Sequence, residues 1–508
     1  MFHTLRIQIK SMARWESSTV RLLGIVEIFL GMALIAPAIV ALIYDEDPMV
    51  FMCTVPILLA LGSIQFIFFK GGEGIKPAGG MLMVFLAWWI AFFVSSVPFY
   101  LSGYPFVDSL FESVSGFTTT GISMVSDTSA PHSVLFWGAI TQWAGGIAVV
   151  LVFLFLLPMM GIGGKALVNN EIAGSETYNF SMRVKGAVKN FISMYVLLSI
   201  VEAALLMVSG VGAFESVTMM FSTISTGGFM AVGGSMGDYS FAAQVIVLAF
   251  MFLGGTNFFL HYRALNKRDF SAYRTSQEFI WTVIWFLLAT VIVVTILLIK
   301  TDDASAAGLG DTVWGSLFTV VSMGTTTGYM MADQPVWPLA TYIVLWMVML
   351  FGSMSGSTSG GIKIYRLLIL KSYINNGIHK MFHPRLIRDV KMDGHSVNND
   401  AVVSAIVVVV MFVVVLIFSM MFLLVSEPGM SISDSIGLSI SAISNSGVNA
   451  GGMTFSELGD VSKVFLTFIM WVGRMEVVVA LLMFTRTFWS DLIKDAKNGR
   501  RSTRKLKN

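Results

Sequence analysis

The chain has 508 residues, of which 56% are hydrophobic and only 12% are charged, and its formal net charge is +2. Soluble domains carry about 25% charged residues, so this composition excludes a soluble domain and indicates a protein embedded in lipid. The single cysteine, Cys53, lies in an apolar run. The chain alone therefore has no means of forming a disulfide or a thiolate metal site.

Ten apolar runs are long enough, or nearly so, to cross a bilayer as helices of about 20 residues. In chain order they are 22–43, 50–69, 81–100, 134–157, 191–208, 241–260, 279–299, 339–351, 401–425 and 464–484. Four shorter segments lie between them, at 107–115, 213–225, 312–323 and 433–444. Apolar segments of about a dozen residues suit re-entrant helices, which enter the membrane and return on the same side. The sequence thus predicts an all-α polytopic membrane protein.

The positive charges predict the orientation of the chain. All Lys and Arg residues except Lys300, Lys463 and Arg474 fall in six groups, which share one side of the membrane if the short segments enter from the other side. Because Lys and Arg accumulate in cytoplasmic loops, we expect both termini in the cytoplasm. The same rule accounts for the basic C-terminal tail, so no nucleic-acid partner is expected.

The four short segments share a pattern that ends in glycine. They read FESVSGFTTTG (111–121), VTMMFSTISTG (217–227), FTVVSMGTTTG (318–328) and GLSISAISNSG (437–447), with the glycines 106, 101 and 119 residues apart. Such a period indicates repeated structural units. We expect four pseudo-repeats of span, re-entrant pore helix with filter loop, and span around one pore. The expected boundaries are 1–78 for a cytoplasmic N-terminus and two peripheral spans, 79–160, 161–264, 265–370 (with a broken second span) and 371–488 for the repeats, and 489–508 for a basic cytoplasmic tail.

The glycine turns have the composition of a cation filter. Non-helical backbone is tolerated at membrane depth only where protein buries it or where it lines a watery cavity. Cation filters line such cavities with carbonyl oxygens, and glycine adopts the required backbone angles most readily. The candidate cation-binding residues are Thr119, Thr120, Gly121, Ser225, Thr226, Gly227, Thr326, Thr327, Gly328, Asn445, Ser446 and Gly447. Each motif alone could be a polar extracellular turn, but four at matched positions favour a filter. The fourth copy, which lacks threonine, is the weakest.

A second irregular segment follows the short apolar run 339–351. It reads GSMSGSTSGG (352–361), and this many Gly and Ser residues disfavour a helix. The segment is either an ordinary cytoplasmic loop or an intramembrane flap below the filter. The flap is favoured, because irregular backbone is tolerated at membrane depth where it lines a cavity. Its candidate gate residues are Gly352, Gly356, Gly360 and Gly361.

The last apolar run contains Arg474. An arginine inside a membrane span is a candidate functional residue. It either forms an ion pair with an acid such as Glu476, Glu112 or Glu202, or it projects into the pore and sets a barrier to cations. The pore role is favoured, which adds Arg474 to the gate residues.

The turns TTTGI, STGGF, TTTGY and NSGVN, their period and the segment WVGRME (471–476) resemble the Trk/Ktr/HKT superfamily of potassium transporters. The two leading spans make the chain most similar to the membrane (pore) subunit of bacterial Trk systems. The resemblance implies a location in the bacterial inner membrane and a homodimer with one pore per protomer. It also implies a cytoplasmic nucleotide-binding partner that gates the pore.

Together these features predict potassium uptake through a channel-like pore with a four-loop selectivity filter. The alternative is a secondary symporter that couples potassium to protons or sodium. Such carriers show inverted repeats and paired acids near the midplane, whereas this repeat is fourfold and parallel. No enzymatic role is expected, because no carboxylate pair, histidine cluster or activated nucleophile stands out. No cofactor is expected in the chain, and potassium at the filter residues is the expected substrate and the only expected metal.

Overall fold

The structure, a computed structural model, describes residues 14–69, 77–125, 130–159, 180–230, 235–300, 308–331, 337–383, 389–448 and 454–494. The chain divides into two compact units. The smaller unit comprises Met1–Ser113, Pro131–Trp137 and Val478–Asn508, and the larger unit comprises Val114–Ala130 and Gly138–Val477. The described secondary structure is helical except for one antiparallel pair of short strands, β1 (Lys391–Met392) and β2 (His395–Ser396). The predicted all-α class is confirmed.

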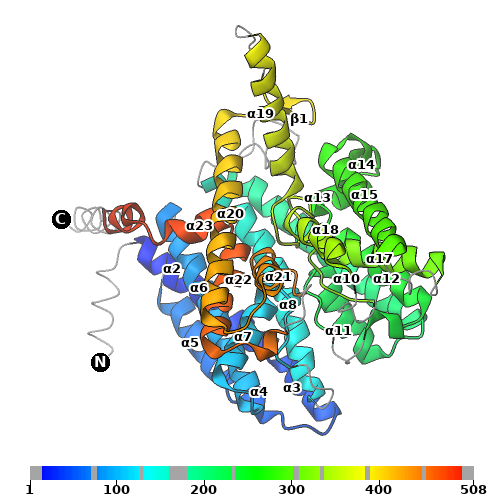
Figure 1. Cartoon of the computed structure of the whole chain (residues 1–508). Coiled ribbons are helices and arrows are strands. Elements are labelled where there is room, and N and C mark those ends of the chain that lie inside the picture. Colours follow the sequence, from blue (N-terminus) through cyan, green and yellow to red (C-terminus); the bar gives the residue numbers. More distant parts are fainter. Residues whose placement is uncertain are drawn as a thin grey trace. The chain divides into compact units, whose positions relative to one another are not determined.

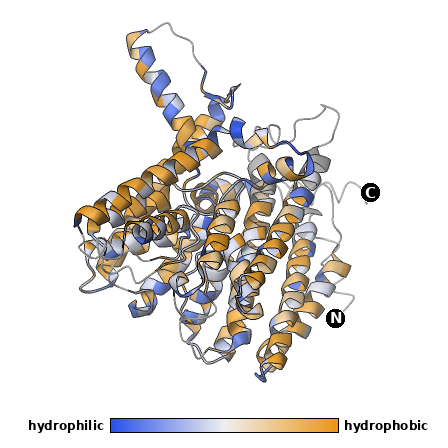
Figure 2. Cartoon of the chain, turned by 90° about the vertical axis from the view of Figure 1, so that its right-hand side faces the viewer, coloured by the Kyte–Doolittle hydropathy of each residue, from blue (hydrophilic) through white to orange (hydrophobic). Residues whose placement is uncertain are grey.

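Seven described helical stretches are long and apolar enough to cross a membrane, or eight if one bent pair forms a single crossing. They are Ser17–Ile43, Met49–Phe68, Ala78–Leu101, His132–Leu151, Gly186–Val208, Gln277–Lys300 and Asn399–Ser426. These helices are hydrophobic along most of their length (Figure 2). The chain is therefore a multi-pass membrane protein.

The smaller unit is built on the packing of α2 (Arg14–Ala33) against α5 (Val55–Phe68). A Cβ atom on Gly62 would lie 2.5 Å from the carbonyl oxygen of Gly24, so the two backbones meet where neither residue has a side chain. Small residues allow such close approach of helices in membranes. The Gln65 amide donates hydrogen bonds of 2.9 and 3.0 Å to the Glu27 carboxylate, which is buried. The other described elements of this unit are α3 (Ile35–Ile43), α4 (Met49–Met52), α6 (Pro77–Leu101), the first part of α7 (Phe106–Phe117) and most of α23 (Val477–Leu482).

The larger unit contains the C-terminal end of α7 and three further short helices, α11 (Ala213–Ile224), α17 (Leu309–Gly324) and α21 (Ile432–Ser444). The four predicted short helices are thus confirmed. The helices α12 (Phe241–Gly254), α18 (Leu339–Leu350) and α22 (Asp460–Arg474) pack against α11, α17 and α21, respectively (Figure 1). The remaining elements are most of α8 (His132–Met159), α10 (Phe180–Val208), η1 (Met236–Asp238), α13 (Phe258–Asn266), α14 (Ser271–Thr275), α15 (Gln277–Lys300), α19 (Ile364–Phe382), α20 (Asn399–Ser426) and η2 (Phe455–Glu457). Of these, α19 projects beyond the other helices of the larger unit (Figure 1).

Three helices of this unit end at a break. The predicted span 241–260 is not one continuous helix, because α12 and α13 are bent by 103°. The break follows Gly254, and the side chain of Asn257 accepts the N–H of Phe259 at 2.9 Å, which caps α13. The predicted span 464–484 is also interrupted, since α22 ends at Arg474 and Glu476 has left-handed backbone angles. By contrast, the predicted interruption after α18 is confirmed.

Candidate functional site

The four short helices end in the same hydrogen-bonded motif. At the end of α7, the N–H groups of Thr119 and Thr120 donate to the carbonyls of Gly116 and Ser115 at 2.9 and 2.8 Å. The same pair of bonds recurs at the ends of α11, α17 and α21. This is the Schellman motif of helix C-termini. It starts four turns, called here the first to fourth turns: 118–121, 225–228, 325–328 and 444–447. Each turn lies at the negative end of a helix dipole, where cations are favoured.

The first left-handed residue of each turn is strained in three of the four cases. The residues are Thr119, Thr226, Thr326 and Asn445, with φ angles of 51°, 55°, 57° and 55°. Asparagine tolerates this conformation, but a β-branched threonine rarely adopts it. Such strain costs about 1–3 kcal/mol per residue and clusters at functional sites, where the surrounding structure enforces it. Its recurrence at equivalent positions marks the four turns as the candidate site.

A left-handed glycine two residues later brings the turns into contact. These glycines are Gly121, Gly228, Gly328 and Gly447, with φ angles of 85°, 79°, 86° and 74°. Cβ atoms on them would lie 1.9, 1.7, 2.4 and 2.1 Å from the carbonyl oxygens of Gly227, Thr327, Ser446 and Thr120, respectively. Each turn therefore abuts the next one, and the fourth abuts the first. The four turns form a closed ring, called here the turn ring.

One predicted position needs correction. The sequence aligns Gly227 with Gly121, Gly328 and Gly447, but the left-handed glycine of the second turn is Gly228. Gly227 instead occupies the position of Thr120, whose carbonyl meets the neighbouring turn in the same way. The motif contains two consecutive glycines and either can adopt left-handed angles, so the sequence alone gives a register that is wrong by one residue.

Hydroxyl pairs brace three of the four turns. Thr118 pairs with Thr120 at 2.7 Å, Thr325 with Thr327 at 2.9 Å, and Ser444 with Ser446 at 3.3 Å. These six residues are buried, whereas the four left-handed glycines are partly exposed. The accessible part of the turn ring is therefore glycine backbone, and the hydroxyl side chains stabilise it from within the protein.

The fourth turn is also tied directly to the first. The Asn445 amide donates hydrogen bonds of 2.9 Å to the Thr120 hydroxyl and to the carbonyl of Met470 in α22. Although the fourth motif lacks threonine, its asparagine provides both the left-handed backbone and a cross-link between turns.

The 352–361 segment is hydrogen-bonded to the turn ring. The Thr226 hydroxyl donates to the Thr358 hydroxyl at 3.3 Å, and the N–H of Gly360 donates to the Thr326 hydroxyl at 2.8 Å. The Thr358 hydroxyl also lies 3.1 Å from the carbonyl of Gly254, where α12 ends. The non-helical segment therefore supplies hydrogen bonds to backbone groups that the break in the helix leaves without a helical partner.

The four glycines predicted in this segment all lie in close contacts. Cβ atoms on Gly352, Gly356, Gly360 and Gly361 would lie 2.1, 3.0, 1.9 and 2.8 Å from oxygens of Gly324, Asn257, Ser444 and Met349, respectively. Gly356 and Gly361 also have positive φ. The segment is thus tightly packed against neighbouring backbone, including the fourth turn.

Two buried charged residues hold the ends of the segment, and neither was predicted from the sequence. One carboxylate oxygen of Glu278 accepts the N–H groups of Ser355 and Tyr365 at 2.7 and 3.1 Å. The Lys363 ammonium donates to the Ser359 carbonyl and, at 3.2 Å, to the Ser359 hydroxyl. In the sequence, Glu278 and Lys363 are only charged residues at the edge of an apolar run. Such residues are common at helix ends, so their position does not predict a contact with a distant segment.

Arg474 has no ion-pair partner among the described residues. It is 6% exposed, and none of its three guanidinium nitrogens has a hydrogen-bond partner in that part of the chain. Glu476, one of the partners considered from the sequence, pairs instead with Arg366 at 2.5 Å. The guanidinium is therefore a buried charge that no described acid compensates directly.

The surroundings of Arg474 connect it to both parts of the candidate site. A Cβ atom on the preceding residue, Gly473, would lie 3.2 Å from the amide oxygen of Asn445 in the fourth turn. Lys363, the other buried cation, donates to the Ser359 hydroxyl in the 352–361 segment at 3.2 Å. Two buried cationic side chains thus lie near the turn ring and the 352–361 segment.

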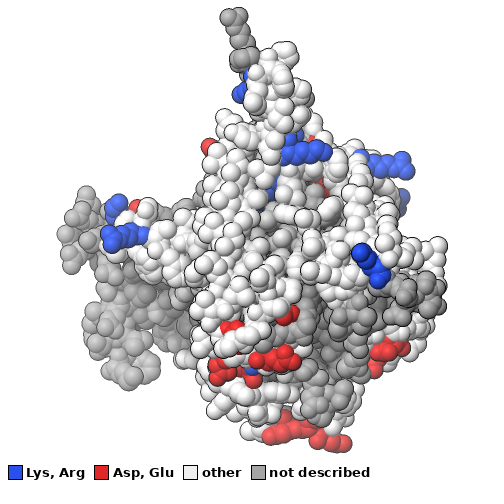
Figure 3. Space-filling model, viewed as in Figure 1, with Lys and Arg blue, Asp and Glu red and all other residues white. Residues whose placement is uncertain are grey.

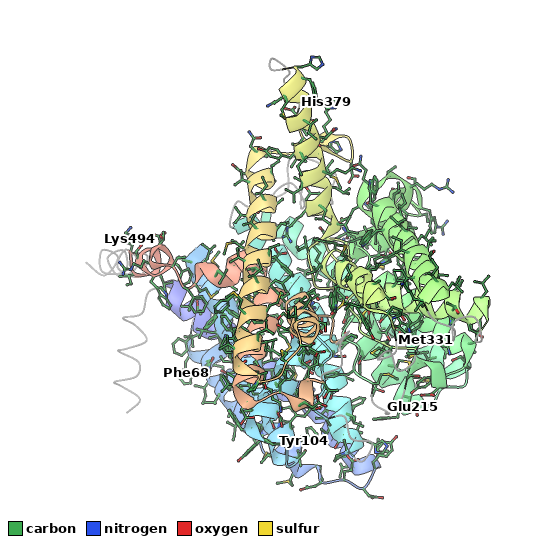
Figure 4. The ribbon with its side chains drawn as sticks, in the orientation of Figure 1. Phe68, Tyr104, Glu215, Met331, His379 and Lys494 are labelled. Atoms are coloured by element: carbon green, nitrogen blue, oxygen red, sulfur yellow. The ribbon has the colours of Figure 1, made fainter. Side chains whose placement is uncertain are left out.

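The start of α11 and the segment after the third turn lie at the same end of the larger unit. Glu215, in the first turn of α11, and Met331, which follows the third turn, lie at one end, away from His379 near the tip of α19 (Figure 4). The Ser235 hydroxyl, beyond the second turn, donates to the Met331 carbonyl at 2.9 Å.

Burial and the nearby Glu215 carboxylate raise the pKa of Tyr239 at this end to about 12, so its phenol stays neutral.

Comparisons with known proteins agree on one family. The family model of TrkH cation transport proteins matches residues 82–495. The Trk system potassium uptake protein TrkH of Escherichia coli K12 is 30% identical over 482 residues, which cover 93% of this chain and 99% of that protein. The Trk system potassium uptake protein TrkG of the same strain is 27% identical and covers 90% of this chain and 96% of that protein. The crystal structure of the potassium transporter TrkH from Vibrio parahaemolyticus superimposes with a TM-score of 0.84 at 27% identity, over 93% of this chain and 99% of that one.

Proposed function

This chain belongs to the TrkH family of cation transport proteins, and from that premise we propose that it takes up potassium across the bacterial inner membrane through a channel-like pore. The observation that carries the proposal is the turn ring, in which four helix C-termini and four left-handed glycines meet. Carbonyl oxygens presented by such turns replace the hydration shell of a cation.

The proposed filter residues are those of the turn ring. They are Thr119, Thr120, Gly121, Ser225, Thr226, Gly227, Gly228, Thr326, Thr327, Gly328, Asn445, Ser446 and Gly447. Gly228 joins the set because it holds the left-handed position of the second turn. The ion is the substrate of the filter, and no resident cofactor enters the proposal.

The proposed gate is the 352–361 segment together with Arg474. Hydrogen bonds of the segment to Thr226 and Thr326 support this role, because they hold non-helical backbone directly against two filter turns. A buried positive charge nearby would oppose the passage of a cation.

The proposed orientation places the projecting end of α19 in the cytoplasm. On the face shown in Figure 3, most Lys and Arg side chains of the larger unit lie toward that end, whereas its Asp and Glu side chains gather toward the opposite one. Lys and Arg mark cytoplasmic loops. The cytoplasmic face would then be available to the regulatory nucleotide-binding subunit, and the protein would act as a homodimer with one pore per protomer.

Potassium-driven flux into liposomes tests the proposed function. Purified protein is reconstituted alone, and uptake of potassium or rubidium is driven by a potassium gradient with no proton or sodium gradient. We expect dissipative uptake that empty liposomes lack. Uptake that occurs only when protons or sodium are supplied would show that the protein is a coupled symporter instead.

Substitution of Glu278 tests the gate. In Glu278→Ala, the N–H groups of Ser355 and Tyr365 lose their acceptor, so the 352–361 segment is held less firmly. Hydrogen bonds to a charged group are among the stronger ones in proteins, and we expect their loss to raise potassium flux by at least about tenfold. Glu278→Gln keeps an acceptor oxygen at this position and should stay near the wild-type rate. If the alanine variant unfolds at a lower temperature but conducts at the wild-type rate, the segment does not limit flux.

A further inference from the structure

The second turn differs from the other three at one position. Before the left-handed glycine, the other turns carry Thr120, Thr327 and Ser446, and each of these hydroxyls is paired within its own turn. The second turn has Gly227 there, so it has no hydroxyl with which to form this pair. Some other group must brace it if the turn ring is to be held equally on all sides.

The side chain of Gln142, in α8, takes that place. Its amide nitrogen donates to the carbonyl of Gly227 at 2.9 Å, and its amide oxygen accepts the N–H of Phe229 at 3.2 Å. A carbonyl needs a donor and an N–H needs an acceptor, so these two partners together define the orientation of the amide. Gln142 is fully buried, and a Cβ atom on Gly227 would lie 2.5 Å from its amide carbon. The amide and a side chain at residue 227 therefore compete for the same space.

The carbonyl that Gln142 binds is one of the four equivalent carbonyls of the turn ring. The other three, of Thr120, Thr327 and Ser446, accept no hydrogen bond from any residue in the described part of the chain. The Gly227 carbonyl is thus the one of the four whose position is fixed by a donor from a neighbouring helix. A hydrogen-bonded carbonyl has less freedom to move toward a bound ion than an unbonded one.

We propose that Gln142 is a specificity-determining residue, which holds the Gly227 carbonyl in place and so prevents the turn ring from contracting around a cation smaller than potassium. The inference rests on the proposed function. Sodium has a smaller radius than potassium, so carbonyls must move inward to coordinate it equally well. A ring whose carbonyls are held apart leaves sodium poorly coordinated, which is one physical basis of potassium selectivity.

The test compares potassium and sodium flux in liposomes for wild type and Gln142→Leu. Leucine is similar in size but removes both hydrogen bonds, which frees the Gly227 carbonyl. The loss of two buried hydrogen bonds corresponds to roughly a tenfold effect or more. We expect the ratio of potassium to sodium flux to fall about tenfold, mainly because sodium flux rises.

Gln244→Leu provides the matched control. Gln244 is also a buried glutamine, in α12, and its amide bonds the Tyr239 carbonyl at 2.9 Å and the Trp314 indole N–H at 2.8 Å. Its partners lie outside the turn ring. This variant should lose stability, as Gln142→Leu does, but keep the wild-type flux ratio. An equal fall of the ratio in both variants would overturn the proposal.

A double variant, Gln142→Ala with Gly227→Ser, tests whether a hydroxyl at residue 227 can replace the amide of Gln142. Removal of the amide makes room for the serine, whose hydroxyl can pair with Ser225 as Ser446 pairs with Ser444 in the fourth turn. We expect the double variant to regain unfolding temperature but not the wild-type flux ratio, because no donor then binds the carbonyl of residue 227. A wild-type ratio in Gln142→Leu, despite normal potassium flux, would contradict the proposal.

Thermal unfolding provides a readout that does not require flux. Ions that bind the folded protein raise its unfolding temperature, so the difference between unfolding in KCl and in NaCl reports filter preference. We expect Gln142→Leu to lose this difference and Gln244→Leu to keep it. If the wild type conducts no cation but shows the difference, the proposed transport fails while the role of Gln142 in ion preference stands. If Gln142→Leu keeps the wild-type difference, the role of Gln142 fails.

Discussion

Replacement of Gly228 by alanine is expected to reduce potassium flux by about a hundredfold or more, which corresponds to roughly 2.7 kcal/mol or more. The left-handed conformation disfavours any residue with a Cβ by about 1–2 kcal/mol. In addition, the new methyl group would lie 1.7 Å from the carbonyl oxygen of Thr327, which belongs to the backbone of the next turn. The overlap can be relieved only if one of the two turns moves, and the turn ring then opens.

Gly210→Ala is the matched control for this substitution. Gly210 has a φ of 95°, yet no atom lies within 4 Å of the position that its Cβ would occupy. The variant therefore carries the backbone strain without the contact. We expect it to lose some thermal stability and to keep its flux in the liposome assay. Normal flux in Gly228→Ala would mean that the turn ring is not the ion pathway.

Neutralisation of Arg474 has the second large expected effect, in the opposite direction. Arg474→Met removes a buried positive charge but keeps a long apolar side chain. At an effective dielectric constant of about 20, two unit charges about 8 Å apart repel by about 2 kcal/mol, which corresponds to roughly a thirtyfold change in rate. We therefore expect potassium flux to rise by about that factor in liposomes that contain the purified variant.

The same substitution should also raise the unfolding temperature, because none of the guanidinium nitrogens has a hydrogen-bond partner among the described residues and an uncompensated buried charge is destabilising. Arg366→Met is the control, since it breaks the pair with Glu476 and should lower the unfolding temperature. An unfolded or non-conducting Arg474→Met variant would show that the arginine has a structural role instead.

The main elements of the fold followed from local features of the sequence. The four short helices were predictable because their apolar length is too small for a full crossing and because each ends in Thr, Ser, Asn and Gly residues. The interruption after α18 was predictable for a similar reason, since Gly and Ser dominate residues 352–361. Each of these features is visible within about a dozen neighbouring residues.

The features that the sequence did not reveal depend on contacts between distant segments. Either Gly227 or Gly228 satisfies the local motif, and only the approach of Thr327 places the left-handed angle at Gly228. The bend between α12 and α13 was hidden in an apolar run, although the pair Gly254 and Gly255 followed by a capping asparagine, Asn257, is a signal that helix ends share.

The four turns of the candidate site were predictable from the sequence. The buried side chains that hydrogen-bond to the site were not. Gln142 and Glu278 act on residues 85 and 77 positions away, respectively, so no local pattern marks them. The sequence left the partner of Arg474 open between several acids. In the described residues none of these acids pairs with it, and Glu476 pairs with Arg366 instead.

The contact between the first and fourth turns affects how this protein can be made. Asn445 bonds Thr120 across 325 positions of the chain, and the carbonyl of Thr120 meets Gly447. During translation the N-terminal part of a chain emerges first, so the first three turns are synthesised long before the fourth exists. Until then the first turn lacks one of its two neighbours, and the turn ring is incomplete. A ribosome that stops within the last repeat would therefore leave an open assembly in the membrane, and the turn ring can close only after the final residues of the fourth turn have been inserted.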